Sequence, residues 1–190
     1  MDRFEFFKRF LFSPGTIGSI TPSSSFLTEK MVKPSEVCVC RNIIELGAGT
    51  GVFTKSLMKL KSSACKLYLF EKDAKLASVL QNKFPDVKLF SDAAKITELR
   101  KKGEIGQVDL IISGLPFTSL PGKIRNEILA GVFDVLKPGG KFITFQYSLH
   151  MLKELEKTYD LINVEFVLLN IPPAFIYRCT KEKKASIVNH

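Results

Sequence analysis

The sequence predicts an α/β fold in which a mostly parallel sheet carries helices on both faces. From about residue 36 onward, short apolar runs rich in β-branched and aromatic residues alternate with helical stretches. Strands separated by helical patterns of about 10–15 residues are typical of crossover units in a parallel sheet. A glycine-rich turn directly follows the first of these runs. The length of 190 residues suits a single domain of ordinary size.

The alternation defines the elements in order. Five strands are expected, at residues 41–46, 66–70, 87–90, 108–113 and 141–147. Four helices are expected between them, at residues 52–61, 74–84, 93–101 and 123–136. The sequence Lys-Pro-Gly-Gly at 137–140 ends the fourth helix and turns the chain into the fifth strand. Two more apolar runs, residues 161–169 and 174–180, have no helix between them, which predicts an antiparallel pair at the sheet edge.

The two ends of the chain depart from this pattern. Within residues 1–35, a helix at about 100° per residue would gather Phe4, Phe6, Phe7, Phe10 and Leu11 in an arc of roughly 160°. Two interpretations stay open: a helix that docks on the domain, or an interfacial helix that dips phenylalanine rings into a bilayer. Residues 181–190 predict a flexible, solvated tail.

Composition excludes some classes of protein and favours certain partners. Lys and Arg number 28 against 19 Asp and Glu, and the net charge of +9 favours nucleic acid, phospholipid headgroups or acidic metabolites. No apolar run approaches the roughly 18 residues of a spanning helix, and charges in the first ten residues argue against a secretory signal. Four cysteines without a CxxC pair argue against zinc, so we expect no metal and reduced thiols, with Cys38 and Cys40 on one face of a strand.

The segment Glu45-Leu46-Gly47-Ala48-Gly49-Thr50-Gly51 is the strongest signal for a ligand site. Its glycines permit a tight turn and close approach of a ligand, and the helix that follows leaves free N–H groups beside that ligand. Glu71, 20 residues after Gly51 and at the end of the second strand, is placed to accept both hydroxyls of a ribose. These features together indicate a nucleoside cofactor.

The details of the turn favour S-adenosylmethionine over a nicotinamide dinucleotide. The spacing is GxGxG, and Glu45 just before it would repel a pyrophosphate. S-adenosylmethionine carries an amino group and a sulfonium cation instead of phosphates, which suits an acidic neighbour. Asp92 follows the third strand and is a candidate partner for the adenine amino group, or equally a helix N-cap.

Several motifs carry a resemblance to a known family. ELGAGTG at 45–51, FEKD at 70–73, SDAA at 91–94 and LKPGG at 136–140 jointly resemble the class I S-adenosylmethionine-dependent methyltransferases. GSITPSS at 18–24, SGLPF at 113–117 and NIPPA at 170–174, which leads into Arg178, are similar to stretches of bacterial phospholipid N-methyltransferases, themselves similar to rRNA adenine dimethylases. The resemblance implies a Rossmann-like, mostly parallel seven-stranded sheet with an antiparallel C-terminal strand, and S-adenosyl-L-methionine as cofactor.

The residue reasoning and the resemblance together define a candidate site. The predicted cofactor-binding residues are Glu45, Gly47, Ala48, Gly49, Gly51, Glu71, Lys72, Asp92, Ala93, Ser113 and Gly114. The predicted substrate-binding residues are Ser24, Ser25, Leu115, Pro116, Phe117 and Arg178, with Ser23 and Lys33 beside them. Ser24, Ser25 and Arg178 are candidate phosphate donors, although the serines also suit a helix cap, and Phe117 could contact acyl chains.

Two departures from the adenine dimethylases favour the lipid branch. Gly114 stands where the dimethylases carry the asparagine that binds the target amino group. The chain also lacks the roughly 70 residues of a separate RNA-binding domain. We therefore expect a monomeric N-methyltransferase that acts on the amine of an anionic or zwitterionic phospholipid, such as phosphatidylethanolamine, at the cytoplasmic membrane surface.

The chemistry requires a free amine, because an aliphatic amine with a pKa of about 10 is mostly protonated at neutral pH. Tyr147, at the end of the fifth strand, is the predicted catalytic residue, which orients the amine. His150 is a further candidate whose position also suits the start of a surface helix. The alternatives are an rRNA or other nucleic-acid adenine N-methyltransferase, a small-molecule methyltransferase, or a cofactor-binding module without catalysis.

Overall fold

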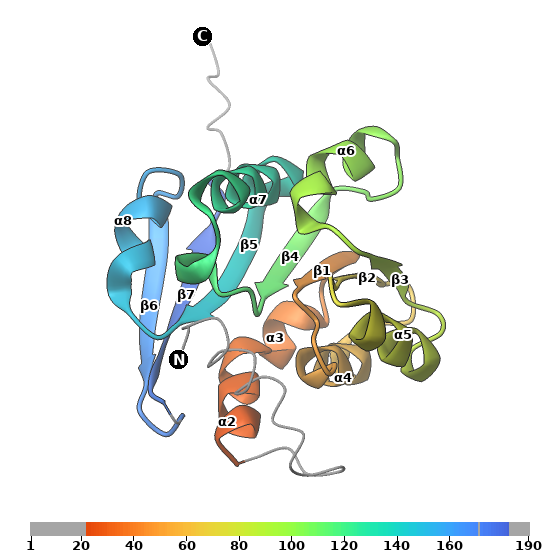
Figure 1. The fold of residues 1–190 in the computed structure, drawn as a ribbon, viewed down its shortest axis with the longest axis horizontal. Helices are drawn as coiled ribbons and strands as arrows, with labels where there is room; N and C mark the ends of the chain where they lie inside the picture. The colour runs from red at the N-terminus through yellow and green to blue at the C-terminus, as the bar shows by residue number, and fades with distance from the viewer. Residues whose placement is uncertain (1–21, 171, 183–190) are drawn as a thin grey trace, which may run out of the picture.

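A single mixed sheet organises the protein (Figure 1). The computed structural model describes residues 22–170 and 172–182, with side chains from Ser25 onward. The strands are β1 (Asn42–Leu46), β2 (Lys66–Phe70), β3 (Lys88–Phe90), β4 (Val108–Ser113), β5 (Leu136–Gln146), β6 (Leu161–Val167) and β7 (Ala174–Thr180). Their order across the sheet is β3-β2-β1-β4-β5-β7-β6. Strands β1 to β5 pair in parallel, and β7 lies antiparallel between β5 and β6, which confirms the predicted fold class.

Helices cover both faces of this sheet. The α-helices are α2 (Pro22–Met31), α3 (Pro34–Val37), α4 (Val52–Leu60), α5 (Ala74–Lys83), α6 (Ile96–Lys101), α7 (Gly122–Val135) and α8 (Leu152–Leu155). Short 3-10 turns occur at η1 (Ala93–Lys95), η2 (Phe117–Ser119) and η3 (Leu149–Met151). The expected helix at 93–101 is therefore a 3-10 turn that continues into a shorter α-helix.

Two hydrophobic cores follow from the alternation of side chains along each strand. Ile43 packs with the α2–α5 side, whereas its neighbour Ile44 packs with the α6–α8 side. Ile112 and Ile111 on β4 divide in the same way. Successive side chains of a strand point to opposite faces, so a strand covered on both faces must be apolar throughout. This is why the central strands appear in the sequence as continuous apolar runs.

The prediction for the first two cysteines is wrong. Cys38 ends the short helix α3, and Cys40 lies in the connection before β1, so the two do not share a strand. Pro34 starts this helix, because its fixed φ suits a first helical turn. Strand β1 begins only at Asn42, after the connection at 38–41. All four cysteines are free thiols, and of these only Cys38 is exposed.

The expected tail begins later than residue 181. The Lys181 N–H donates to the carbonyl of Gly140, and the Gly139 N–H donates to the carbonyl of Lys181. The Lys181 ammonium also donates to the carbonyls of Phe133 (2.6 Å) and Leu136 (2.8 Å). The remaining tail prediction, for residues 183–190, and the amphipathic-helix prediction for the first residues both lie outside the described part of the chain.

Within residues 22–170 and 172–182, no helix has the length and apolar character needed to cross a bilayer.

Candidate cofactor and methyl-transfer site

The glycine-rich turn joins β1 to α4 at the carboxyl edge of the parallel strands. Gly47, Gly49 and Gly51 have φ angles of +71°, +58° and +82°, a region that side chains other than glycine rarely adopt. The N–H groups of Gly47 and Ala48 both donate to the Phe70 carbonyl, at 2.8 and 3.1 Å. The turn is therefore fixed to the end of β2, with α4 starting immediately after Gly51.

The turn lies directly against the SGLPF segment. The Gly114 N–H donates to the Leu46 carbonyl at 2.8 Å. A Cβ atom on Gly47 would lie 2.8 Å from Leu115 Cδ2, and one on Gly114 would lie 3.1 Å from the Gly47 carbonyl oxygen. The structure thus brings the predicted cofactor turn and the predicted methyl-transfer segment into contact, and an added Cβ at either glycine would be closer to this neighbour than an ordinary van der Waals contact.

Glu45 is a fully buried carboxylate next to the turn. Its Oε2 accepts a hydrogen bond from the Thr54 hydroxyl at 2.7 Å, whereas its Oε1 is buried without a hydrogen-bond partner among the described residues. Burial raises the pKa of Glu45 to about 8, a rise that the Thr54 hydrogen bonds oppose and nearby Glu71 increases. A buried oxygen with free lone pairs here fits the amino group of S-adenosylmethionine, because an unpaired buried acceptor is costly.

Glu71 connects the glycine turn to the end of β2. Its Oε2 accepts the Gly49 N–H and its Oε1 accepts the Asp73 N–H, each at 2.8 Å. A carboxylate oxygen can accept more than one hydrogen bond, so both oxygens keep capacity for ribose hydroxyls. The side chain is buried, and the adjacent Lys72 is exposed.

Asp92 caps the 3-10 turn that follows β3. Its Oδ1 accepts the Ala94 N–H at 3.0 Å, so the N-cap interpretation is confirmed. Ala93 is half-buried against the α6–α7 core. The role of Asp92 toward adenine stays a prediction, and this hydrogen bond leaves its second oxygen available for it.

The segment after β4 is held by hydrogen bonds from β5. Ser113 is buried, and its hydroxyl accepts the Leu115 N–H at 3.1 Å. The Gln146 side-chain amide donates to the Leu115 carbonyl at 3.0 Å. Gln146 is not among the predicted site residues, although a polar residue at the end of an apolar strand is a recognisable signal for such a contact.

Phe117 faces the core in this structure. It has no exposed surface and packs edge-to-face on Phe142, with 6.0 Å between the ring centroids. Its neighbours in the motif, Leu115 and Pro116, lie at the start of the η2 turn. Contact of Phe117 with acyl chains stays a prediction, and it requires this side chain to leave its packed position.

Tyr147 follows β5 at the same edge of the sheet as the glycine turn. Its ring is half-buried and packs edge-to-face on Phe145. Burial raises the pKa of Tyr147 above its usual range, and the nearby polar side chain of Asn170 opposes this rise. A phenol with a raised pKa stays protonated, so it can orient an amine but does not serve as a strong base. Asn170, quoted in the NIPPA motif without a role, is thus a neighbour of Tyr147.

His150 lies farther from this group, in the exposed η3 turn, with its Nδ1 2.9 Å from the Ser148 hydroxyl. Its surroundings match the surface-helix interpretation.

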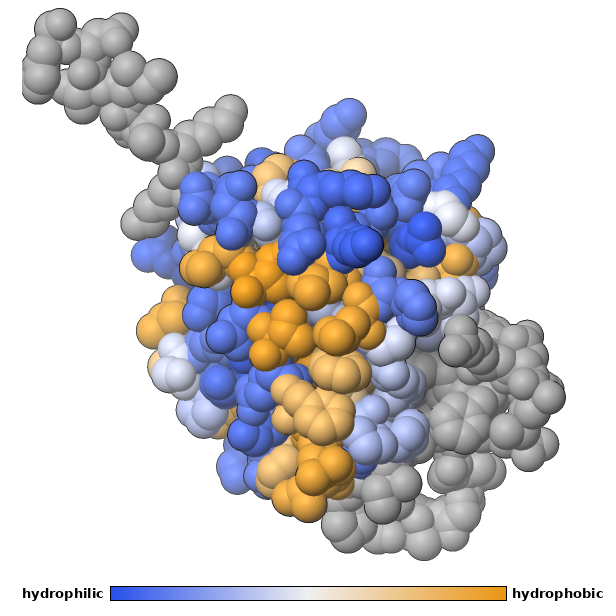
Figure 2. Space-filling model, turned by 90° about the vertical axis from the view of Figure 1, so that its left-hand side faces the viewer, coloured by the Kyte–Doolittle hydropathy of each residue, from blue (hydrophilic) through white to orange (hydrophobic). Residues whose placement is uncertain are grey.

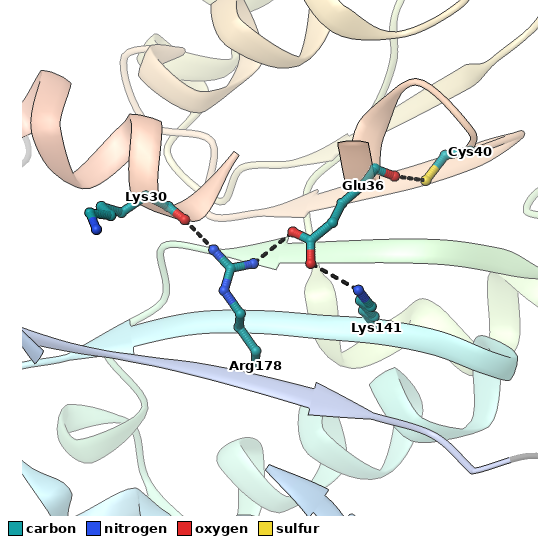
Figure 3. Close-up of polar contacts among 5 residues, drawn as sticks. All are labelled: Lys30, Glu36, Cys40, Lys141 and Arg178. Carbon is teal, nitrogen blue, oxygen red and sulfur yellow. Dashed lines mark hydrogen bonds and ion pairs between the residues drawn. The ribbon is translucent and has the colours of Figure 1, made fainter. Parts of the chain in front are cut away.

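Arg178 is held in an ion pair beneath α2 and α3 (Figure 3). Its Nη1 donates to Glu36 Oε2 at 2.7 Å, and its Nη2 donates to the Lys30 carbonyl. The other Glu36 oxygen accepts from the Lys141 ammonium at 2.9 Å. The guanidinium already donates to Glu36 and to a backbone carbonyl. Phosphate binding by Arg178 therefore stays a prediction, and it would require rearrangement of this ion pair.

The predicted serines lie at the start of α2. Ser25 is half-buried in its first turn, and the side chain of Ser24 lies outside the described part of the chain. Among the residues whose side chains are described, no group of three or more metal-ligating side chains gathers.

Comparison with known proteins bears on the family to which this chain belongs. A family model described as a methyltransferase domain matches residues 43–140, which is 98 of the 190 residues. The chain is 29% identical to an ornithine lipid N-methyltransferase from Singulisphaera acidiphila, over 97% of this chain and 98% of that protein. It is 25% identical to the ribosomal RNA small subunit methyltransferase A of Thermotoga neapolitana, but over only 60% of this chain and 41% of that protein.

A solved structure shares the fold. The N-methyltransferase NodS from Bradyrhizobium japonicum, in complex with S-adenosyl-L-homocysteine, superposes with a TM-score of 0.68. The match covers 94% of this chain and 98% of that one, at 12% sequence identity. With the glycine turn, the acids at the ends of β1 and β2, and the strand order, the comparisons show that this chain belongs to the class I S-adenosylmethionine-dependent methyltransferases.

Proposed function

We propose that the protein transfers methyl groups to the amine of a lipid headgroup, of the phosphatidylethanolamine or ornithine-lipid type. The observation that carries this proposal is the end-to-end match to an ornithine lipid N-methyltransferase, which covers 97% of this chain and 98% of that protein. The match to the ribosomal RNA methyltransferase covers 41% of that protein, so more than half of its length has no counterpart here.

Gly114 supports the same choice of substrate. An asparagine at this position, as in the adenine dimethylases, would place a Cβ 3.1 Å from the Gly47 carbonyl oxygen. The cofactor turn would have to shift to accept it. Because position 114 carries no side chain in this protein, the asparagine-based recognition of an adenine amino group has no counterpart here.

We assign the cofactor to the cradle formed by the glycine turn, Glu45 and Glu71. Glu71 would accept the ribose hydroxyls, and the unpaired oxygen of Glu45 would accept the ammonium group, directly or through a water. S-adenosylmethionine supplies a methyl group on a sulfonium, which an amine displaces in line. The residues of this chain then have to hold the amine in line with that methyl group and exclude water.

The amine would approach between Tyr147 and the Gly114–Leu115 backbone. The Leu115 carbonyl already accepts hydrogen bonds from the Gln146 side-chain amide and from the Phe117 N–H, each at 3.0 Å. The Gly114 carbonyl is therefore the backbone acceptor that we propose for an amine hydrogen. Burial of the amine beside Leu115 and Tyr147 favours its neutral form, because desolvation disfavours the charged state. Tyr147 would orient the amine through its hydroxyl, and Gln146 would hold the Gly114–Leu115 segment in place beside it.

A labelled-methyl assay tests the proposal. The full chain is supplied with labelled S-adenosylmethionine and, separately, with phosphatidylethanolamine vesicles, ornithine-lipid vesicles, free ethanolamine, free ornithine and ribosomal RNA. We expect label in a lipid fraction and none in RNA, and loss of this label in Glu71→Ala. Label that enters RNA, or the free amines alone, would refute lipid headgroup methylation.

A further inference from the structure

Large apolar side chains are exposed on β6 and on the turn after it. Phe166 is 54% exposed, Leu168 67% and Leu169 65%. We call these three residues the apolar tip. Figure 2 shows the side of the molecule on which β6 and α8 lie, with a band of apolar surface between polar flanks. Exposed apolar surface of this kind marks an interaction site more often than a free surface.

The apolar tip lies at the same edge of the sheet as the methyl-transfer site. Strands β5 and β6 are both antiparallel to β7, so they run in the same direction. Strands β1 to β4 run in that direction too, because they pair in parallel with β5 or with one another. Phe166 pairs with Phe175, which in turn pairs with Gln146 at the end of β5. Asn170, next to Leu169, contacts Tyr147 through its side chain.

Strand β6 is the outermost strand at one edge of the sheet, and it lacks the charged side chains that usually prevent such a strand from pairing with another chain. Strand β6 contains no lysine or arginine, and its single acid, Glu165, is neutralised by Lys30 at 2.7 Å. Exposed edge strands of proteins that stay free in water commonly carry lysine or proline. The composition of β6 therefore indicates that this region meets an apolar partner.

We propose that the apolar tip inserts into the interfacial region of a lipid bilayer and holds the methyl-transfer site against the headgroups. This inference rests on the proposed function, because a headgroup amine can reach Tyr147 only if that edge faces the membrane. The net charge of +9 favours an anionic leaflet, and an uncharged apolar tip on a basic protein has the chemistry of interfacial binding. A second copy paired along β6 would leave Leu168 and Leu169 uncovered, since both lie in the turn beyond the strand.

The absence of tryptophan from the chain provides a clean probe. Leu168→Trp reports on the apolar tip. Leu161→Trp is the matched control, because Leu161 is 60% exposed on the same strand but roughly 20 Å away at the opposite edge of the sheet. Vesicles of phosphatidylcholine and phosphatidylglycerol, which offer no amine acceptor of the ethanolamine or ornithine type, should shift the Leu168→Trp emission to the blue. Brominated acyl chains should quench it and leave Leu161→Trp unchanged.

A pair of polar variants measures the contribution to binding. We expect the double substitution Leu168→Asn with Leu169→Asn to weaken flotation with these vesicles by about tenfold or more, and Leu161→Asn to leave it unchanged. Calorimetry should show unaltered binding of S-adenosylmethionine in both variants, which establishes that they are folded. Methylation of a short-chain, monomeric amino-lipid should be retained in the double variant, whereas methylation of the same headgroup in vesicles should fall.

Three results would overturn the inference. The first is equal loss of vesicle binding in Leu161→Asn and the double variant, and the second is no loss in either. The third is a Leu168→Trp emission that is already blue-shifted without vesicles, which would mean that the chain itself or a second copy covers the tip; sedimentation separates those two cases. Failure of the proposed function has a different signature: the tip inserts, and no amino-lipid is methylated.

Discussion

Glu45 is both a candidate cofactor ligand and a buried acid with a raised pKa. It is fully buried with one oxygen bonded to Thr54 and the other without a partner among the described residues. Burial keeps its proton bound to higher pH, with a pKa of about 8 against 4.5 in the unfolded chain. In the ligand-free protein, the native state therefore binds more protons than the unfolded state at any pH between 4.5 and about 8.

The sign of the pH dependence follows directly. Because the native state holds the extra proton, the free energy of unfolding falls as pH rises from about 4.5 to about 8. We expect Glu45→Gln, which keeps an acceptor for Thr54, to remove this slope, so that the wild type loses stability relative to the variant by on the order of a few kcal/mol. Urea unfolding of both proteins across this pH range measures the difference, and parallel curves would contradict the assignment.

Glu71 should matter for the cofactor more than for the fold. Glu71→Ala removes the carboxylate acceptor from the predicted ribose site, so we expect the affinity for S-adenosylmethionine to fall by about tenfold or more. Asp73→Ala is the matched control, because its carboxylate caps α5 through the N–H groups of Lys75 and Leu76. That variant should lose about 1 kcal/mol of stability and keep its affinity. Calorimetry decides, and equal losses of affinity would argue against a ribose role.

At the scale of elements, the β1–α4 turn and the segment after β4 form one unit. Gly47 has a positive φ, and its missing side chain leaves room for Leu115. Two separate penalties should therefore add in Gly47→Ala, one from backbone strain and one from the contact of the new methyl group with Leu115 Cδ2.

The substitution Gly103→Ala measures the backbone penalty without the side-chain contact. It has a similar φ of +74°, and nothing lies within 4 Å of its absent Cβ. We expect Gly103→Ala to lower stability by about 1 kcal/mol, and Gly47→Ala to lower it by at least about 1 kcal/mol more. Only Gly47→Ala should weaken binding of S-adenosylmethionine. Denaturant unfolding and calorimetry test both statements, and equal stability losses would show that Leu115 moves away at no cost.

At the scale of the whole molecule, Glu36 joins distant parts of the chain. It binds Arg178, 142 residues away, and Lys141, 105 residues away, and so connects α3 to β5 and β7. Glu36 and Arg178 have side-chain exposures of only 13% and 10%. Removing one member would leave the other charge without its partner in a poorly solvated place.

We expect Glu36→Gln and Arg178→Met each to lower stability by about 2 kcal/mol or more. If the pair is purely structural, neither folded variant should change the KM for amino-lipid by more than about twofold. A raised KM in Arg178→Met alone would instead support the predicted phosphate contact. Thermal unfolding and steady-state kinetics on mixed micelles distinguish these two roles.

The first residues of the chain bear on how the whole protein meets a membrane. If residues 1–12 form the interfacial helix that the sequence allows, their deletion should weaken vesicle association more than cofactor affinity. Flotation and calorimetry on the truncated protein measure the two effects. Equal losses in both would favour a helix that docks on the domain instead.

The sequence by itself determined the succession of elements and located the candidate site. The glycines, Glu45 and Glu71 act through short-range geometry, in which a turn after a strand and an acid after the next strand meet at one sheet edge. The apolar runs likewise predicted each of the seven strands and their parallel or antiparallel character. These features depend on residues that are close together in the sequence, so they can be predicted from one sequence alone. The predicted turn at 137–140 is wrong, because β5 already begins at Leu136 and includes these residues.

The tertiary structure alone decided which residues that are distant in the sequence come into contact. The Arg178–Glu36 pair, the support of Leu115 by Gln146, and the contact of Asn170 with Tyr147 all join residues that no local pattern links. The apolar run at 161–169 resembles a buried strand in sequence, yet its last residues are among the most exposed apolar ones described. Burial depends on what packs against a segment, and here β7 inserts between β5 and β6 and leaves β6 at the edge.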